Sequence, residues 1–337
     1  MTEKLNVGIA GAGRIGRVHA EHLSYRMPGV NLVSVTDIYR KGAEALAADF
    51  NVPHVDDDFD TLLQRDEIDA VFICSSTDTH APFMIAAAEA GKHIFCEKPI
   101  AADLAKIDEA LAAVEKSGVK LQIGFNRRFD SNYRRVKHAI EQGEIGTPHL
   151  MHIISRDPAP PPLEYVKVSG GLFFDMMIHD FDMARYLLGD VDEVYATGGV
   201  LVDPAIGEAG DIDTAMVTLK FANGAIGVID NSRQAVYGYD QRVEVLGSKG
   251  AAQTGNNYPN TAIVSTATQI QRDLPLNFFM ERYMESYLQE AREFVDVVQN
   301  DAPIPVTGAD GRAPVVLAMA AKLSLDENRP VKISEVG

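Results

Sequence analysis

The stretch LNVGIAGAGRIG, residues 5–16, joins a short apolar run to a turn that contains three glycines. Gly11, Gly13 and Gly16 have the spacing G-x-G-x-x-G, and a helical pattern follows them. In that context the first glycine makes a tight turn, the second lets a phosphate approach the backbone, and the third lets the helix pack on the sheet. The stretch therefore predicts a strand, a phosphate-binding turn and a helix whose positive end faces a dinucleotide.

The first 125 residues continue this pattern, with short apolar runs that alternate with helical segments. Strands that are apolar throughout and separated by helices indicate a parallel sheet covered on both faces. Six strands complete a dinucleotide-binding domain in the order 3-2-1-4-5-6. The predicted strands are Leu5–Ala10, Asn31–Asp37, a short run near His54, Ala70–Cys74, His93–Cys96 and Leu121–Phe125. The predicted helices are Ile15–Tyr25, Lys41–Phe50, Asp60–Gln64, His80–Ala90 and Leu104–Ser117.

From about residue 149 the pattern changes to longer strand-like runs separated by turn residues. We therefore predict an α/β chain with an N-terminal Rossmann dinucleotide-binding domain, residues 1–125, and a C-terminal α+β domain, residues 126–337, built on a large, mostly antiparallel open sheet. Residues 225–229 are apolar on both faces, so we expect a second subunit to cover the far side of that sheet. The predicted strands are His149–Arg156, Glu193–Gly199, Thr214–Phe221, Ala225–Arg233 and Arg242–Gly247, and the predicted C-terminal helices are Ser286–Asn300 and Ala309–Leu325.

Candidate cofactor residues lie at the carboxyl ends of the parallel strands. Asp37, which is 21 residues after Gly16, can accept both hydroxyls of an adenosine ribose and repel a 2′-phosphate, which favours NAD over NADP. Arg14 or Arg40 could hold a phosphate, so some tolerance for NADP stays open. The hydroxyl residues after the fourth strand leave room for a dinucleotide, although Thr79 could equally cap a helix. The predicted cofactor contacts are Gly11, Gly13, Arg14, Ile15, Gly16, Asp37, Arg40, Ser75, Ser76, Thr77, His80, Glu97 and Lys98.

The stretch FDMMIHDFDMARYLL, residues 174–188, predicts one continuous helix with two opposite faces. An ordinary solvent-facing side would mix Lys and Glu, but here two carboxylates accompany an imidazole, which can hold a proton and pass it on. The apolar face carries Met177, Phe181, Ala184 and Leu188, and the polar face carries Asp175, His179 and Asp182.

Lys98 supplies a positive charge at the end of the fifth strand, within Cys96-Glu97-Lys98-Pro99. Pro99 keeps Lys98 out of helical backbone conformation and stiffens this edge of the sheet. A lysine at the ligand crevice suits a nicotinamide and a substrate hydroxyl. We therefore expect Lys98 to meet His179 and Asp175 at the nicotinamide ring.

Further polar residues could surround a hydroxylated substrate. Arg127 and Arg128 follow the sixth strand, but either could instead form an ion pair with Asp130. Tyr237 or Tyr239 could donate a hydroxyl, and the sequence does not choose between them. The predicted substrate contacts are Lys98, Asn126, Arg127, Asp157, Asp175, His179, Asp182, Tyr237 and Tyr239.

Composition excludes several other classes. The 337 residues carry a formal net charge of −17, which opposes binding to nucleic acid or to anionic membranes. No apolar run approaches the roughly 20 residues that span a bilayer. The two cysteines, Cys74 and Cys96, indicate reduced buried thiols and a cytoplasmic protein, and we expect no metal site.

Taken together, the motifs resemble the Gfo/Idh/MocA family of NAD(P)-dependent oxidoreductases. The resemblance is carried by GAGRIG at 11–16, SSTDTH at 75–80, EKP at 97–99 and the pair Asp175 and His179. This family resemblance covers essentially the whole chain. Longer blocks resemble the inositol-oxidising branch of that family. These blocks are GFNRRFD at 124–130, SRDPAPPP at 155–162, SGGLFFDMMIHDFDMARYLLG at 169–189 and YGYDQRVEVLGSKG at 237–250.

This resemblance implies a catalytic triad of Lys98, Asp175 and His179 in a homotetramer. The implied reaction oxidises the axial hydroxyl of myo-inositol to scyllo-inosose while NAD becomes NADH, with His179 as the general base. One alternative is another inositol stereoisomer or a cyclic aldose, because substrate choice depends on pocket contacts that a fold does not fix. A third reading is a hydride-recycling hydrolase or lyase, or a dinucleotide sensor without turnover.

Overall fold

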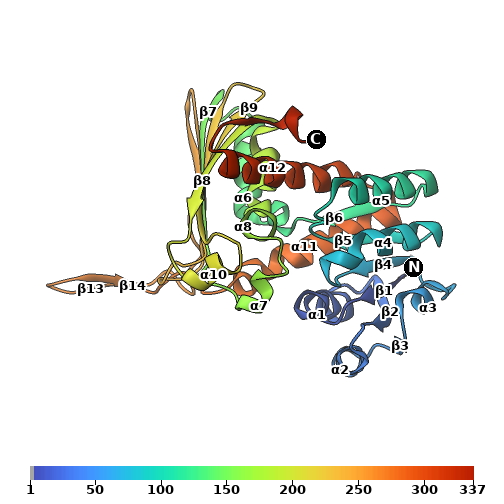
Figure 1. Cartoon of the computed structure of the whole chain (residues 1–337). Helices are drawn as coiled ribbons and strands as arrows, with labels where there is room; N and C mark the ends of the chain where they lie inside the picture. Colours follow the sequence, from blue (N-terminus) through green and yellow to red (C-terminus); the bar gives the residue numbers. More distant parts are fainter. Residues whose placement is uncertain (1–3) are drawn as a thin grey trace. The chain divides into compact units, whose positions relative to one another are not determined.

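The computed structural model describes residues 4–337, and the chain divides into two compact units (Figure 1). The N-terminal unit runs up to Phe129 and also includes Met284–Ala313. The C-terminal unit consists of Asp130–Tyr283 and Pro314–Gly337. Each unit contains a large β-sheet of its own.

Six parallel strands form the sheet of the N-terminal unit: β1 (Leu5–Ala10), β2 (Val30–Thr36), β3 (His54–Asp56), β4 (Ala70–Ile73), β5 (His93–Glu97) and β6 (Leu121–Gly124). Their order is β3-β2-β1-β4-β5-β6, and every neighbouring pair is parallel. All residues of β4 are buried although successive side chains point to opposite faces, so both faces of the sheet are covered. The predicted Rossmann-type arrangement is confirmed.

Helices follow the strands where the sequence predicted them. They are α1 (Arg14–Glu21), the π-helix η1 (His22–Arg26), α2 (Arg40–Phe50), α3 (Phe59–Leu63), α4 (Thr77–Glu89), α5 (Leu104–Ser117) and the 3-10 helix η2 (Asn126–Phe129). The side chain of Asp103 caps α5 at its start, and Gly118 ends it with a left-handed φ of 71°. Such termination explains why the boundaries could be read from the sequence.

Most of one helix from the end of the chain, from Met284 onwards, belongs to the N-terminal unit. Helix α11 (Phe279–Asn300) buries Leu288, Ala291 and Phe294 in the same core as β1, β2, β4 and β5. The ring of Phe294 meets the ring of Phe72 edge-on, with 5.3 Å between centroids. The domain boundary predicted between residues 125 and 126 assigned this helix to the C-terminal domain, because an amphipathic pattern does not reveal which sheet a helix covers.

The C-terminal unit contains a seven-stranded sheet made of β7 (Pro148–Arg156), β8 (Val191–Gly199), β9 (Thr214–Phe221), β10 (Ile226–Ser232), β11 (Asp240–Gly247), β12 (Gly250–Thr254) and β15 (Val331–Lys332). The order is β12-β11-β7-β10-β9-β8-β15. Strands β7 and β10 are parallel, and the other pairs are antiparallel. The predicted mostly antiparallel sheet is confirmed. A separate hairpin, β13 (Ile263–Ser265) and β14 (Ile270–Arg272), extends away from this sheet (Figure 1).

The helices of this unit are α6 (Ser131–Glu141), α7 (Leu163–Val166), α8 (Leu172–Asp175), α9 (Ile178–Leu188), α10 (Pro204–Glu208) and the greater part of α12 (Gly308–Glu327). Helices α6, α8 and α12 lie on one side of the sheet (Figure 1). On this helix side, buried Asn231 of β10 donates a hydrogen bond to Asp180 of α9. The opposite side, here called the open face, exposes Leu150, Met216, Ile226 and Leu246. This open face agrees with the expected two-sided apolar pattern.

The prediction of one continuous helix over 174–188 is wrong, because α8 ends at Asp175 and α9 begins at Ile178. The amide of Met177 bonds five residues back to Leu172, and the amide of Asp180 bonds only three residues back to Met177. The consecutive apolar residues 176–178 are all buried. One straight helix turns about 100° per residue and could not bury all three on one face. Asp175 and His179 therefore lie on different helices.

Residues 4–337 contain no helix that is both long enough and apolar enough to cross a membrane.

Candidate active site

The glycine-rich turn between β1 and α1 fits a dinucleotide. Gly11 has a φ of 106°, and a Cβ on it would lie 2.5 Å from the carbonyl oxygen of Cys74. A Cβ on Gly16 would lie 1.9 Å from the carbonyl oxygen of Gly11. A Cβ on Gly13 would meet no atom within 4 Å, so the backbone at the start of α1 faces open space. These three positions match the close turn, tight helix packing and phosphate access that a pyrophosphate site needs.

Asp37 follows β2 and points back to this turn. Its Oδ2 accepts a hydrogen bond from the amide of Ala12 at 2.6 Å, and its Oδ1 accepts one from the amide of Tyr39 at 2.7 Å. Arg40 instead pairs with Glu44 at 2.9 Å and with Asp57. Arg40 is thus engaged by two carboxylates, while Asp37 lies beside the glycine-rich turn.

His80 links the ends of β4 and β5. Its Nδ1 lies 2.7 Å from the carbonyl oxygen of Pro99, and its Nε2 lies 3.0 Å from that of Ser75. Burial lowers the pKa of His80, while the two carbonyl oxygens, which only accept, act in the opposite direction. His80 is almost fully buried and connects the two strand ends, and its direct contact with the cofactor stays a prediction. Ser75 and Thr79 share a hydrogen bond of 2.6 Å between their hydroxyls.

A second buried histidine holds the residue before Lys98. His19 Nε2 lies 3.2 Å from Glu97 Oε1 and 3.9 Å from Glu290 Oε1. Burial, reinforced by the charge of Glu97, raises the pKa of Glu290 well above its usual range. The sequence had not identified His19 or Glu290. The peptide bond between Lys98 and Pro99 is cis.

His19, Glu97 and Glu290 are also the one trio of potential metal-binding side chains found within residues 4–337. Their ligand atoms lie within 4.8 Å of one another. The aromatic rings of Phe72 and Phe95 contact His19, with centroids 5.3 Å and 5.0 Å away.

The residues after β6 are buried in η2. Asn126, Arg127 and Arg128 are 2%, 5% and 7% exposed. Arg128 donates to Asp310 Oδ1 at 3.1 Å, while Asp130 forms a buried ion pair with Arg282. Asp130 therefore pairs with Arg282, a partner that the sequence analysis did not name.

In the C-terminal unit, Asp175 and His179 are half-buried at the end of α8 and the start of α9. Asp175 Oδ1 accepts a hydrogen bond from the Tyr165 hydroxyl at 2.7 Å, and its Oδ2 accepts one from Arg233 Nη1 at 3.2 Å. Asp182, predicted on the same polar face, is fully buried. Neither Tyr165 nor Arg233 was predicted, because their sequence distance from Asp175 gives no sign of contact.

The two candidate tyrosines have structural partners. The Tyr237 hydroxyl donates to Asp240 Oδ2 at 2.6 Å and accepts a bond from Arg156 at 3.2 Å. Side chains alternate between the two faces along β7, so Arg156 lies on the same open face as Leu150. The Tyr237 hydroxyl that it contacts therefore lies on the side of the sheet away from α9. Tyr239 is buried, and its ring meets that of Tyr283 edge-on.

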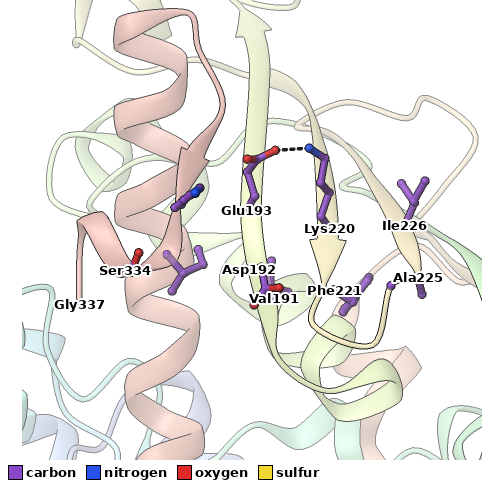
Figure 2. A pocket seen from close by; sticks show the side chains of 12 residues that line it. Val191, Asp192, Glu193, Lys220, Phe221, Ala225, Ile226, Ser334 and Gly337 are labelled. Carbon is purple, nitrogen blue, oxygen red and sulfur yellow. Dashed lines mark hydrogen bonds and ion pairs between the residues drawn. The ribbon is translucent and has the colours of Figure 1, made fainter.

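A pocket of about 770 Å³ lies at one edge of this sheet, as Figure 2 shows. Strands β8 and β9 and the C-terminal segment line it, and an ion pair joins Glu193 to Lys220 across its wall. None of the predicted site residues lines it.

Comparisons with known proteins identify both units. Residues 5–125 match the model described as "Oxidoreductase family, NAD-binding Rossmann fold", and residues 133–253 match the model described as "GFO/IDH/MocA C-terminal domain". The chain is 52% identical to the uncharacterized oxidoreductase YrbE of Bacillus subtilis, over 99% of this chain and 98% of that one. It is 48% identical to the myo-inositol 2-dehydrogenase of Thermotoga maritima, over 98% of this chain and 99% of that one.

Solved structures agree with these matches. A crystal structure from Thermotoga maritima superimposes with a TM-score of 0.97 at 48% identity, covering 99% of this chain and all of that one. The structure of scyllo-inositol dehydrogenase from Lactobacillus casei with bound NAD(H) and scyllo-inositol gives 0.93 at 31% identity, covering 98% of this chain and all of that one. The similarity therefore includes both units and extends from end to end.

Proposed function

Because the chain belongs to the Gfo/Idh/MocA family and is an NAD-dependent oxidoreductase, we propose that it oxidises myo-inositol to scyllo-inosose. The observation that carries this proposal is the 48% identity with a myo-inositol 2-dehydrogenase over nearly the full length of both chains. A shared fold alone does not identify a substrate, so the proposal also assigns a role to individual side chains.

The N-terminal unit holds the cofactor in this proposal. NAD, when bound, supplies the acceptor for the hydride that leaves the carbinol carbon. The amides between Gly11 and Gly16 bind its pyrophosphate at the positive end of α1. Asp37 accepts the adenosine ribose hydroxyls and disfavours a 2′-phosphate, which makes NADP the poorer cofactor.

His179 takes the proton of the substrate hydroxyl as the carbonyl forms. Histidine suits this role because imidazole titrates near neutral pH. Asp175 orients His179 and stabilises the imidazolium, and Lys98 donates a hydrogen bond to the reacting oxygen. Each of these contributions lowers the barrier by about 2–4 kcal/mol by analogy with other general bases and oxyanion donors. One alcohol and NAD thus yield one ketone, NADH and a proton.

Asn126, Arg127 and Asp157 are the further residues we propose to contact the remaining hydroxyls. A polyol requires several paired donors and acceptors, because any group left unpaired in a closed site weakens binding. Asp182 and Tyr239 are buried, and the Tyr237 hydroxyl is engaged by Asp240 and Arg156. For these three residues, direct substrate contact stays a prediction.

A second candidate substrate is scyllo-inositol. The chain is 36% identical to the scyllo-inositol 2-dehydrogenase (NAD(+)) of Bacillus subtilis, over 99% of this chain and 97% of that one. The two isomers differ in the orientation of a single hydroxyl, so a few pocket contacts decide between them.

The test measures NADH absorbance with the purified chain, NAD and one polyol at a time: myo-inositol, scyllo-inositol, D-chiro-inositol or glucose. We expect the highest kcat/KM with myo-inositol. A higher value with scyllo-inositol favours the second candidate. No net NADH with any of the four overturns the proposed substrate, and cleavage of a glycoside by the NAD-loaded protein would then favour hydride recycling. Repeating the assay with NADP gives the cofactor ratio.

We further propose that a second copy of the chain covers the open face and that the assembly is a cytoplasmic tetramer. Leu150, Met216, Ile226 and Leu246 would otherwise expose apolar surface to water. An isologous contact between two identical open faces buries all of them at once.

A further inference from the structure

Arg233 is a fully buried cation that lies between two carboxylates of the C-terminal unit. It follows β10 and is 1% exposed. Its Nη1 lies 3.2 Å from Asp175 Oδ2, and its Nη2 lies 3.5 Å from Asp211 Oδ2. A charge of this kind is buried only where other charges compensate its lost hydration. Asp175 and Asp211 supply that compensation.

Asp211 fixes the start of the helix that ends in Asp175. Its Oδ1 accepts a hydrogen bond from the amide of Leu172, the first residue of α8, at 3.0 Å. Gly171 precedes this residue with a φ of 90°, and a Cβ there would lie 2.8 Å from the same oxygen. The single turn of α8 is therefore anchored at one end by Asp211 and at the other by the contact between Arg233 and Asp175.

Tyr165 holds Asp175 from a more exposed position. The tyrosine is 47% exposed, and its hydroxyl donates to Asp175 Oδ1 at 2.7 Å. Both carboxylate oxygens of Asp175 are therefore fixed by donors on separate elements, α7 and the segment after β10. The break between α8 and α9 makes this important, because no continuous helix fixes Asp175 relative to His179.

We propose that Arg233 is the positioning residue for Asp175 in the dehydrogenation, with Tyr165 as its second anchor. The inference rests on the proposed function, in which Asp175 orients His179. Arg233 acts through Asp175 and does not itself touch the substrate. A guanidinium suits the position because its planar donors reach two carboxylates at once, which the single ammonium of lysine does less well.

The test compares Arg233→Met with Arg233→Lys in the full-length protein. We expect Arg233→Met to lower kcat roughly 10- to 100-fold with NAD affinity unchanged, because a small misplacement of a catalytic group costs about this much. Arg233→Lys should recover part of the loss. A matched control is Arg65→Met, which removes the guanidinium from the Arg65–Asp56 pair of the N-terminal unit. It should reduce thermal stability while kcat changes less than about twofold.

Two further measurements keep the proposal testable. If Arg233→Met does not fold, Tyr165→Phe removes only an exposed hydroxyl, and kcat should fall about 3- to 10-fold. A crystal structure of Arg233→Lys should show the Asp175 carboxylate turned from its present orientation.

Wild-type kcat in folded Arg233→Met, or in Tyr165→Phe where the first variant does not fold, overturns the positioning role while leaving the proposed function intact. If the wild-type protein oxidises no inositol, the proposed function fails, and the crystal structure then decides the positioning role separately. An unmoved Asp175 carboxylate in that structure would count against it.

Discussion

The carboxylate of Asp37 accepts a hydrogen bond from the backbone amide of Ala12, with 2.6 Å between Oδ2 and nitrogen. This bond ties the end of β2 to the glycine-rich turn. The carboxylate expected to hold the adenosine ribose is thus hydrogen-bonded directly to the turn expected to hold the pyrophosphate. Each carboxylate oxygen can accept more than one hydrogen bond, so Asp37 can serve the turn and the ribose together.

We expect Asp37→Asn to shift cofactor preference from NAD towards NADP. The variant keeps an oxygen that can accept from Ala12 but loses the negative charge that repels a 2′-phosphate. Hydrogen bonds to charged groups contribute about 1.5–3 kcal/mol, so NAD affinity should fall about 10-fold or more. The measurement is the ratio of kcat/KM for the two cofactors. Arg312→Gln is the control, since Arg312 pairs with Asp108 and belongs to none of the predicted cofactor contacts, and an unchanged ratio in Asp37→Asn would contradict the role of Asp37.

The fold of the N-terminal unit could be predicted because its signals are local. The three glycines, the apolar strands and the helix ends each depend on neighbouring residues, and all agree with the structure. The return of α11 to that unit could not be predicted in the same way. Its apolar residues Leu288 and Phe294 indicate a buried face but not the sheet that they bury against.

The sequence analysis named candidate reactive groups but not the residues that contact them. His179 and Asp175 stand out by type and spacing, whereas Arg233 is 58 residues from Asp175 and Glu290 is much farther from His19. Contacts over such distances are set by tertiary packing and leave no period in the sequence. The prediction of a continuous helix was wrong for a related reason. Met176 and Met177 are both buried by tertiary packing, which the helical period of the sequence does not reveal.

Replacement of His179 by alanine should lower kcat by about 10²- to 10⁴-fold, the usual contribution of a general base. NAD affinity should stay close to that of the wild type, because the proposed cofactor contacts belong to the other unit. Steady-state rates and titration with NADH separate the two effects. His149→Ala removes an exposed histidine of the same unit and serves as the control. Wild-type turnover in His179→Ala would exclude it as the base.

Glu290→Gln should change how stability depends on pH. Burial raises the pKa of Glu290 far above its value near 4.5 in an unfolded chain. A raised carboxyl pKa stabilises the fold fully below pH 4.5, and this stabilisation is lost as the pH rises towards the folded pKa. Within that window the group lowers the free energy of unfolding by about 1.4 kcal/mol per pH unit.

The amide in Glu290→Gln does not titrate, so the melting temperature of the variant relative to the wild type should rise as the pH increases above 4.5. Glu285→Gln is a suitable control, because the exposed Glu285 pairs with Arg26 at the surface. If the melting temperatures of the wild type and Glu290→Gln changed with pH in parallel between pH 5 and pH 8, Glu290 would be ionised in the folded protein.

The open face makes a prediction about assembly. Ile226 is 52% exposed on β10, and a second copy packed there would bury it. Ile226→Asp would place a charge in that contact, where an unpaired buried carboxylate costs several kcal/mol, so the oligomer should dissociate. Light scattering after size-exclusion chromatography measures the mass. Leu201→Asp changes an exposed apolar residue outside the sheet and should leave the mass unchanged. In a twofold contact, the two introduced aspartates would face each other, so their repulsion would add to the cost of their lost hydration. An intact oligomer in Ile226→Asp would therefore mean that another surface joins the subunits.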